Sequence, residues 1–463
     1  MKVLLIVPDG VAVRNYLYSS FIVELFKKKA EVIIYHQLSE SAITEIKNVH
    51  PQLDTFIEIP KFIESPLTRL LRESLAFARI LRNIKVLKNR TVITFWNRNH
   101  KTFKLKALNI VSEFFGFILS KSYQLVLKAD YWYEKRILKS QVIEKITKDI
   151  KSINPDVVLN LHQRSPLTAP IVAVAKKEKI KCSTVIFSWD NIPKARLISR
   201  YDSYLVWSDL MKDQLVLLYP EISEHQVLVV GTTQFECYFN QENYLKKELF
   251  FKQYGLDPLK RTICFSANDK SSPYDPNYLE DVCKVIKEMV ENERPQILFR
   301  RCPVDKSDRF DSILETYKSF VTPIDPDWRV ESHLKTAFTS IYPTYNDFVL
   351  LVNTVKHCDL VINLGSTMAH DFAILDKPCL YLNYDPIHNS TLPVNTIYNF
   401  EHFRSMKGLN AVGWINSKAE ILDMILKTLN KPNEVGADRK KWMETIVLHP
   451  LDKNAINIAK ALL

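Results

Sequence analysis

The feature that most constrains this chain is a regular alternation between short apolar runs and longer segments with helical periodicity. The run "KVLLIVP" at residues 2–8 precedes a helical segment at 15–29, and "DVVLNLH" at 156–162 precedes another. Apolar runs of four to eight residues between helices are typical of strands in parallel sheets, which helices cover on both faces. The alternation therefore predicts a doubly wound α/β fold.

The same alternation occurs twice, which predicts two domains. A second cycle begins after Gln241 and includes "TICFSAN" at 262–268 and "DLVINLG" at 359–365. The residues between the cycles are polar and charged and suit a linker. We therefore expect two Rossmann-like, doubly wound parallel-sheet domains facing a central cleft. The expected boundaries are an N-terminal domain at 1–232, a linker at 233–250 and a C-terminal domain with terminal helices at 251–463.

Cysteine usage and hydropathy indicate a cytoplasmic protein. The seven cysteines are odd in number, lie mostly in apolar runs and form no CxxC pair. This pattern predicts reduced, buried thiols, and it does not fit a disulfide framework or a zinc site. The apolar stretch at the start of the chain is too short for a signal peptide, and no run of about 18 apolar residues predicts a membrane span.

Positive charge is concentrated in one segment, residues 82–139. The formal net charge of the chain is +11, and this segment holds 13 Lys and Arg against 3 acids, a net of +10. Its basic residues are interleaved with apolar ones, as in "FKLKALNIVSEFFGFILSK" at 103–121. This pattern is typical of a helix on an anionic bilayer surface, and an ordinary amphipathic insertion in the N-terminal domain is the alternative. We expect no nucleic acid partner, because no recognition motif accompanies the basic residues.

Glycine is rare, and one glycine stands at a corner suited to phosphate. The chain has 8 glycines, and Gly365 follows the run "DLVINL" while Ser366 and Thr367 open the next helical segment. Ligands of open parallel sheets bind beyond the carboxyl ends of the strands, where helix N-termini offer N–H groups. The corner therefore suits a phosphate, and a plain helix cap by Ser and Thr is the alternative.

This corner lies in a segment, residues 345–385, that resembles the donor-binding region of the GT-B fold glycosyltransferases. The resemblance is to the bacterial surface-polysaccharide type, which is related to nucleotide-sugar 2-epimerases and CDP-glycerol glycerophosphotransferases. In these enzymes a strand ends in a Gly-Ser-Thr or similar turn, and a "GKP" turn leads to the next strand. Here the residues at 376–378 are Asp, Lys and Pro.

Three other segments resemble motifs of the same superfamily. "ILFRRCP" at 297–303 is similar to an RxHP corner, with Cys302 in place of histidine. "FSWDNIPKAR" at 187–196 and "VVGTTQFECY" at 229–238 look like the SWDN and GxPQFD segments, with Glu236 in place of aspartate. The resemblance covers most of the chain in order.

The resemblance and the strand-end positions assign a substrate-binding set to the C-terminal domain. Its expected members are Gly365, Ser366, Thr367, Arg300, Ser266, Asn268, Lys270, Asn346, Asp347 and Asp371. A leaving nucleotide diphosphate gains negative charge, which a helix N-terminus and cationic side chains can stabilise without a metal. The resemblance likewise implies a metal-independent enzyme, so we expect no metal and no cofactor beyond the nucleotide-sugar substrate. A polar loop at 266–272 and simple helix capping at Asn346 and Asp347 are the alternatives.

An inverting transfer also needs a base near the acceptor hydroxyl. Asp190 is the first candidate for this catalytic residue because it follows the strand "STVIFSW", and His162, at the end of "DVVLNL", is the second. A turn carboxylate and a structural histidine are the corresponding alternatives. Asn15, after the first strand, is a weaker candidate for the acceptor side.

The expected function is transfer of a sugar from a nucleotide-diphosphate sugar to a surface-glycan or lipid-linked acceptor. The expected place is the cytoplasm, with peripheral attachment to the inner face of the cell membrane through residues 82–139. Alternatives on the same fold are a nucleotide-sugar 2-epimerase and a CDP-glycerol-type glycerophosphotransferase, although the acid and histidine signatures of the epimerases have no obvious match here. A non-catalytic nucleotide-binding scaffold is the alternative outside enzymes.

Overall fold

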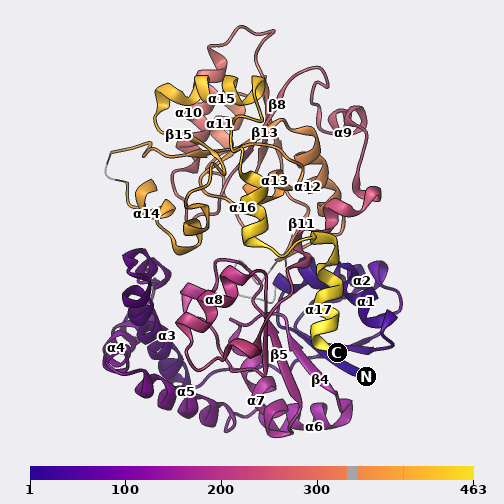
Figure 1. Cartoon of the computed structure of the whole chain (residues 1–463), viewed down its shortest axis with the longest axis vertical. Helices are drawn as coiled ribbons and strands as arrows, with labels where there is room; N and C mark the ends of the chain where they lie inside the picture. The colour runs from indigo at the N-terminus through magenta and orange to yellow at the C-terminus, as the bar shows by residue number, and fades with distance from the viewer. Residues whose placement is uncertain (331–340, 389) are drawn as a thin grey trace. The chain divides into compact units, whose positions relative to one another are not determined.

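The computed structural model describes residues 1–330, 341–388 and 390–463, which form two compact units (Figure 1). Unit 1 consists of Met1–Gln234, Phe400–His402 and Ile446–Leu463, and unit 2 consists of Phe235–Asn399 and Phe403–Thr445. Each unit is built on its own parallel sheet, as the alternation of apolar runs predicts.

Unit 1 contains a seven-stranded sheet in the order β3-β2-β1-β4-β5-β6-β7, and every neighbouring pair is parallel. Its strands are β1 (Lys2–Val7), β2 (Glu31–His36), β3 (Thr55–Glu58), β4 (Val157–Asn160), β5 (Lys181–Val185), β6 (Ser203–Val206) and β7 (Val227–Val229). The central strands β1 and β4 are buried along almost their whole length, which explains their unbroken apolar sequences.

The helices of unit 1 connect these strands and cover the sheet. They are α1 (Ser20–Lys27), α2 (Glu40–Val49), α3 (Pro66–Leu87), α4 (Phe103–Leu119), α5 (Tyr123–Ile137), α6 (Ile143–Ile153), α7 (Ala169–Lys177), α8 (Asp209–Leu218) and α17 (Asn454–Leu462). Several begin with a serine or threonine whose side chain accepts a hydrogen bond from the first turn, as Ser65 does for α3 and Thr102 for α4.

Unit 2 contains, in the described part of the chain, a six-stranded parallel sheet in the order β10-β9-β8-β13-β14-β15. Its strands are β8 (Thr262–Ser266), β9 (Gln296–Arg300), β10 (Val321–Ile324), β13 (Leu360–Asn363), β14 (Cys379–Leu382) and β15 (Gly413–Ile415). A separate antiparallel pair joins β11 (Trp328–Val330) to β12 (Ile341–Pro343). The helices are α9 (Lys247–Tyr254), α10 (Asp275–Lys287), α11 (Asp311–Thr316), α12 (Asn346–His357), α13 (Met368–Ile374), α14 (Val394–Tyr398), α15 (Ile421–Asn430) and α16 (Arg439–Ile446).

The C-terminal segment differs from the sequence expectation, which places all of 251–463 in the second domain. Residues 446–463 belong to unit 1, where α17 packs against α1. The backbone N–H of Leu448 donates to the carbonyl of Trp207 at 2.7 Å, and the Asn454 side-chain amide donates to the carbonyl of Thr232 at 3.2 Å. The physical reason is the apolar face of α17, which is buried within unit 1.

The expected linker at 233–250 is also more structured than its polar composition predicts. From Phe235 onward it belongs to unit 2, and α9 begins within it at Lys247. Asn353 of α12 fastens it: its side-chain oxygen accepts from Leu245 N at 2.8 Å, and its Nδ2 donates to the carbonyl of Asn243 at 2.7 Å. Asn243 thus forms buried hydrogen bonds, whereas Gln241, Glu242, Lys246 and Glu248 face solvent.

The basic segment at 82–139 forms part of a layer of three helices, in which α3, α4 and α5 lie side by side (Figure 1). The contact between α3 and α4 is very close, because a Cβ added to Gly116 would lie 2.7 Å from the carbonyl oxygen of Ser74 and 2.9 Å from the Cβ of Phe77. The Cβ-less residue therefore sets how near the two backbones come.

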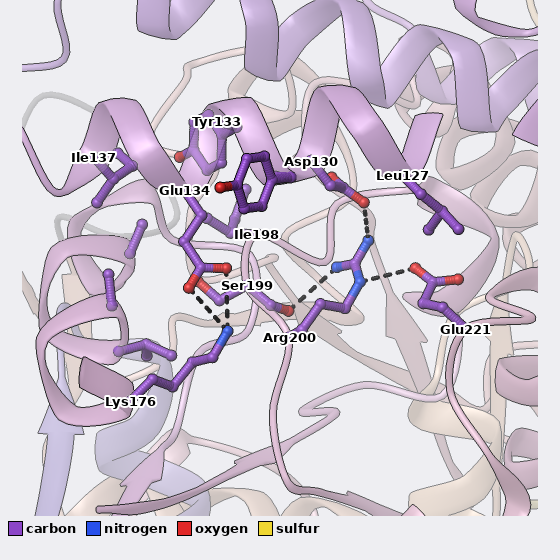
Figure 2. A pocket seen from close by; sticks show the side chains of 14 residues that line it. Leu127, Asp130, Tyr133, Glu134, Ile137, Lys176, Ile198, Ser199, Arg200 and Glu221 are labelled. Carbon is purple, nitrogen blue, oxygen red and sulfur yellow. Dashed lines mark hydrogen bonds and ion pairs between the residues drawn. The ribbon is translucent and has the colours of Figure 1, made fainter. Parts of the chain in front are cut away.

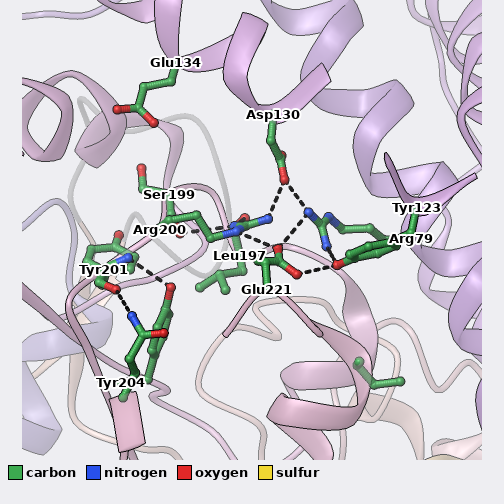
Figure 3. Close-up of polar contacts among 12 residues, drawn as sticks. Arg79, Tyr123, Asp130, Glu134, Leu197, Ser199, Arg200, Tyr201, Tyr204 and Glu221 are labelled. Carbon is green, nitrogen blue, oxygen red and sulfur yellow. Dashed lines mark hydrogen bonds and ion pairs between the residues drawn. The ribbon is translucent and has the colours of Figure 1, made fainter. Parts of the chain in front are cut away.

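A buried group of charges, the Arg79–Arg200 cluster, fastens this layer to the rest of unit 1. It consists of Arg79 of α3, Tyr123 and Asp130 of α5, Arg200 and Glu221 (Figure 3). Asp130 pairs with both arginines, and Arg200 Nε lies 2.8 Å from Glu221 Oε1. The Tyr123 hydroxyl donates to Glu221 Oε2 at 2.5 Å. Burial alone would raise the pKa of Glu221, but Arg200 and Arg79 outweigh burial and lower it to about 2.

We predict that Arg79→Met lowers the free energy of unfolding by about 3 to 5 kcal/mol, because it leaves Asp130 and Glu221 with too little compensating charge in a buried place. Lys85→Met is the matched control on the exposed side of α3, and it should change the free energy by less than about 0.5 kcal/mol. Urea unfolding followed by circular dichroism measures both. Equal losses would show that the cluster is not what holds the layer.

Candidate functional site

Each sheet has one topological switch point, which is the place where the connections from two neighbouring strands leave in opposite directions. Ligands of open α/β sheets bind at such a point, beyond the carboxyl ends of the strands. In unit 1 the switch point lies between β1 and β4, and in unit 2 it lies between β8 and β13. Most of the residues singled out from the sequence follow these strands or their neighbours.

Gly365 forms the corner after β13, and the structure explains why glycine stands there. Its φ is +64°, in the left-handed region that other residues rarely adopt. A Cβ at this position would lie 2.9 Å from the Phe403 ring and 3.5 Å from Ile397. Both the backbone conformation and the close packing therefore require the absence of a side chain.

Ser366 and Thr367 follow this corner and precede α13. The N–H of Ser366 donates to Asn363 Oδ1 at 2.8 Å, and the Ser366 hydroxyl accepts from the N–H of Met368 at 3.4 Å. Ser366 thus serves partly as a cap, which was the simpler alternative from the sequence. Thr367 is exposed, so its hydroxyl is accessible to a ligand.

The loop after β8 is tied to the Gly365 corner across the switch point. Asn268 Nδ2 donates to the carbonyl of Leu364 at 2.9 Å, and the N–H of Asn268 donates to Asp275 at 2.5 Å. Burial raises the pKa of Asp275 to about 6. Ser266 is buried at the end of β8, and Lys270 is exposed further along the loop. The structure therefore brings the two expected phosphate corners together, with Asn268 as the link.

Arg300 and Asp347 form a buried pair beside this edge. Arg300 ends β9, and its Nη2 lies 3.2 Å from Asp347 Oδ1 in the first turn of α12. Asp347 also accepts from the N–H of Asp327 at 3.0 Å and from the indole of Trp328 at 2.8 Å. Arg300 is 5% exposed, and its Nη1 has no hydrogen-bond partner among the described residues. A buried cationic donor without a partner is costly, and an anionic ligand would satisfy it.

Two other expected residues take different places in unit 2. Asn346 is exposed at the start of α12, where a ligand can reach it. Asp371 is buried on α13 and accepts a hydrogen bond from the Tyr238 hydroxyl at 2.9 Å. Asp371 is thus engaged within the protein, which suits a structural position better than direct contact with a substrate.

At the switch point of unit 1, His162 meets Asp9. Asp9 follows β1 and His162 follows β4, and Nδ1 of the histidine lies 2.8 Å from Asp9 Oδ2. Both side chains are buried, and the His162 ring packs edge-on against Phe187 at 4.7 Å. The two groups lie close together without forming a hydrogen bond, because Nδ1 has no hydrogen-bond partner among the described residues. Imidazole is the side chain best suited to exchange a proton near neutral pH.

Asp190, the first candidate base from the sequence, is held in an ion pair. Its carboxylate accepts from Ser188 at 2.7 Å and from Lys194 Nζ at 2.5 Å. Burial alone would raise the pKa of Asp190, but Lys194, the nearby His402 and these hydrogen bonds outweigh burial and lower it well below its usual value. A carboxylate with a strongly lowered pKa is a weak base at neutral pH.

A cavity of about 220 Å³ lies between α5 and α7, apart from the switch-point residues, and part of the Arg79–Arg200 cluster lines it. Figure 2 shows that its charged lining residues point toward one another, with Lys176 3.0 Å from Glu134 and Arg200 2.6 Å from Asp130. These pairs neutralise each other, so the cavity lacks the uncompensated positive charge that a diphosphate needs. Among the described residues no group of three or more His, Cys, Asp or Glu side chains is arranged to hold a metal ion.

Comparison with solved structures identifies the fold. No family model matches the chain, and no curated protein matches it in sequence. UDP-GlcNAc 2-epimerase from Neisseria meningitidis, solved with UDP-GlcNAc, matches with a TM-score of 0.56 and 12% identity over 100% of this chain and 99% of that one. The UDP-GlcNAc 2-epimerase from Methanocaldococcus jannaschii gives 0.54 and 14% over 100% and 99%. A glycosyltransferase from Rickettsia africae ESF-5 gives 0.55 and 12% over 100% and 98%.

The chain has the GT-B fold. The two parallel sheets and the match over the whole chain confirm the fold class expected from the sequence.

Some polar residues of this GT-B chain were not singled out by sequence reasoning. Asp9 stands directly after the first strand, and this strand-end position is the sequence feature that could have identified it as a candidate site residue. Arg164 donates to Asn191 Oδ1 at 3.0 Å, and Arg309 donates to the carbonyls of Ser272 at 2.6 Å and Asn268 at 2.8 Å. Arg309 lies far along the chain from the loop that it holds, so no sequence pattern connects them.

We predict that Gly365→Ala destabilises unit 2 by roughly 1 to 3 kcal/mol more than Gly255→Ala does, because only the first substitution also crowds Phe403. Gly255 is a matched control, since its φ is +68° and no atom lies within 4 Å of an added Cβ. Urea unfolding of the two variants and the wild type measures the difference. Equal destabilisation would mean that the Phe403 ring moves aside freely.

Proposed function

We propose that this protein is an enzyme that uses a nucleotide-diphosphate sugar and transfers the sugar to the hydroxyl of a glycan or lipid-linked acceptor. In this proposal unit 2 binds the nucleotide diphosphate. The observation that carries it is the switch point of unit 2, where the Gly365 corner, the Asn268 loop and buried Arg300 belong to neighbouring strands. Nη1 of Arg300 has no hydrogen-bond partner in the part of the chain that the structure describes. An anion there gains hydrogen bonds from groups that are already fixed in place.

The proposed reaction exchanges one bond at the anomeric carbon for another. The acceptor oxygen forms a bond to this carbon, and the bond to the diphosphate oxygen breaks and leaves its electron pair with the nucleotide diphosphate. The hydroxyl proton passes to a base. We propose His162 for this role in place of Asp190, because the His162 ring lies beside the Asp9 carboxylate at the switch point whereas the pKa of Asp190 is strongly lowered.

A second candidate function is 2-epimerisation of a nucleotide sugar. It is supported by the solved structures of similar fold, several of which are named UDP-GlcNAc 2-epimerases. Both functions require the same kind of nucleotide-diphosphate site in unit 2. They differ in the products, since an epimerase returns a nucleotide sugar and needs no acceptor.

We expect the protein to be stabilised by one nucleoside diphosphate in a thermal-shift screen of UDP, GDP, CDP and TDP, with CMP as a monophosphate. A ligand at 100 times its dissociation constant stabilises the folded protein by about 2.7 kcal/mol.

Thr367→Val should weaken binding of the best ligand by about 1.5 to 3 kcal/mol in calorimetry, because it removes an accessible hydroxyl without changing the shape of the side chain.

Thr316→Val on α11 is the matched control for this measurement, since Thr316 is also exposed and lies in unit 2. Unchanged affinity of the Thr367 variant would remove that residue from the proposed site. A chain that no nucleotide stabilises would contradict the proposal itself.

We expect His162→Gln to lower turnover by about 100 to 10,000-fold while the affinity for the nucleotide sugar stays near that of the wild type. Asp190→Asn is the comparison variant. Turnover is followed by chromatography of the products, with and without a lipid-linked acceptor. Release of nucleotide diphosphate only with acceptor supports transfer, and a C2-epimeric nucleotide sugar formed without acceptor establishes the second function.

Loss of turnover in Asp190→Asn together with full turnover in His162→Gln would reverse the roles of the two residues. Loss of fold in both variants, seen by circular dichroism, would make both residues structural.

A further inference from the structure

Helix α4 turns its large apolar side chains outward, which is the reverse of an ordinary surface helix. Its buried residues are the small Ser112 and Gly116, which face α3. Phe103 is 84% exposed, Ile110 is 70% exposed and Phe114 is 62% exposed. The side of α4 that would normally enter a core therefore faces out of unit 1.

These exposed residues form one continuous stripe. At 3.6 residues per turn, Phe103, Ile110, Phe114 and Phe117 fall on the same side of α4. The adjacent α5 adds two exposed aromatic rings, Tyr131 and Trp132. We call this surface the α4–α5 face, and its members are Phe103, Ile110, Val111, Phe114, Phe115, Phe117, Ile118, Leu125, Tyr131 and Trp132. Single exposed apolar residues are ordinary, but a patch of this extent indicates a binding surface.

The charges around the α4–α5 face are positive. The exposed lysines on and beside α4 and α5 are Lys101, Lys104, Lys106, Lys121, Lys128, Lys135 and Lys139. Lys121 Nζ lies 4.0 Å above the Phe117 ring, and Lys135 Nζ lies 5.2 Å from the Tyr131 ring. Cationic and aromatic groups are thus in direct contact on this surface.

The three acids of the segment do not offset these lysines, because each acid is already engaged by a cation. Glu113 pairs with Arg98 at 2.9 Å, Asp130 belongs to the Arg79–Arg200 cluster, and Glu134 pairs with Lys176 at 3.0 Å. The α4–α5 face consequently presents apolar groups and excess positive charge together.

We propose that the α4–α5 face docks on an anionic membrane surface, with α4 lying parallel to the bilayer plane. Apolar and aromatic residues would enter the boundary between headgroups and acyl chains, and the lysines would contact anionic headgroups. Tyr and Trp favour this boundary because their rings are apolar with a polar edge. In the described part of the chain no helix is long and apolar enough to cross a membrane.

Charge favours a membrane over a second copy of this chain as the occupant. A symmetric dimer through the α4–α5 face would place lysines opposite lysines, and lysine is depleted at protein interfaces. Anionic lipid headgroups instead complement the charge of the lysines. The Arg79–Arg200 cluster and the tight contact at Gly116 hold the face in a fixed orientation on unit 1.

The test is sedimentation of the whole chain with vesicles of phosphatidylcholine containing about 30% phosphatidylglycerol, at low and at high salt. We expect the wild type to sediment at low salt and to be released as salt screens the lysines, while pure phosphatidylcholine vesicles bind it weakly. Lys101→Glu with Lys104→Glu and Lys106→Glu should weaken partitioning by about 100-fold or more, since each near-surface basic residue contributes about 1 kcal/mol. Phe114→Ser with Phe117→Ser should also release the protein.

The matched control replaces Lys145, Lys148 and Lys151 of α6 with glutamate. These lysines are 61%, 73% and 63% exposed, so the change in net charge is the same on another helix of unit 1. The control should keep its binding to vesicles. Equal binding by all variants, equal loss in the control, or no binding by the wild type would each overturn the proposal.

Analytical ultracentrifugation without lipid tests whether a second copy of this chain binds the α4–α5 face. A wild-type dimer that Phe114→Ser with Phe117→Ser converts to a monomer would assign the face to self-association and overturn the membrane proposal. Circular dichroism confirms that each variant is folded. None of these measurements uses turnover, so the outcome is independent of the proposed enzymatic function.

Discussion

Each unit of this protein depends on a parallel sheet that must be covered on both faces. Strands buried on both sides favour apolar side chains along their length, so charged groups gather where the strands end. The carboxyl edge is where helices begin, and their first N–H groups need partners. At both switch points these requirements coincide, and they place Asp9 beside His162 in unit 1 and Asn268 beside the Gly365 corner in unit 2.

Polar groups at these edges are mostly held by other polar groups, and this decides which of them remain available for chemistry. Asp347 accepts hydrogen bonds from several donors, and Lys194 neutralises Asp190. Two groups differ from these: Nη1 of Arg300 has no hydrogen-bond partner among the described residues, and Thr367 is exposed. A site of this kind is rigid before any ligand arrives, so little ordering would accompany binding.

The sequence predicts the sheets well, because apolar runs report burial directly. The strand ends and Gly365 follow from the same runs, and so does the placing of Ser366, Asn268 and His162 at carboxyl edges. Pairings between distant segments are not visible in the sequence. The ion pair of Asp190 with Lys194 and the role of Arg309 depend on how loops fold back, and the return of α17 to unit 1 depends on which unit buries its apolar face. Composition identifies the segment at 82–139 as basic and apolar, but only the structure shows that the small residues of α4 are the buried ones.

The return of residues 446–463 to unit 1 also affects how the chain is made. On the ribosome, domains generally fold in order from the N-terminus as they emerge. Unit 1 cannot be completed in that order, because α17 packs against α1 and is synthesised after unit 2. The nascent chain must therefore carry an uncovered apolar surface on α1 throughout the synthesis of unit 2. Termination of translation before α17 would consequently damage the unit that was translated first.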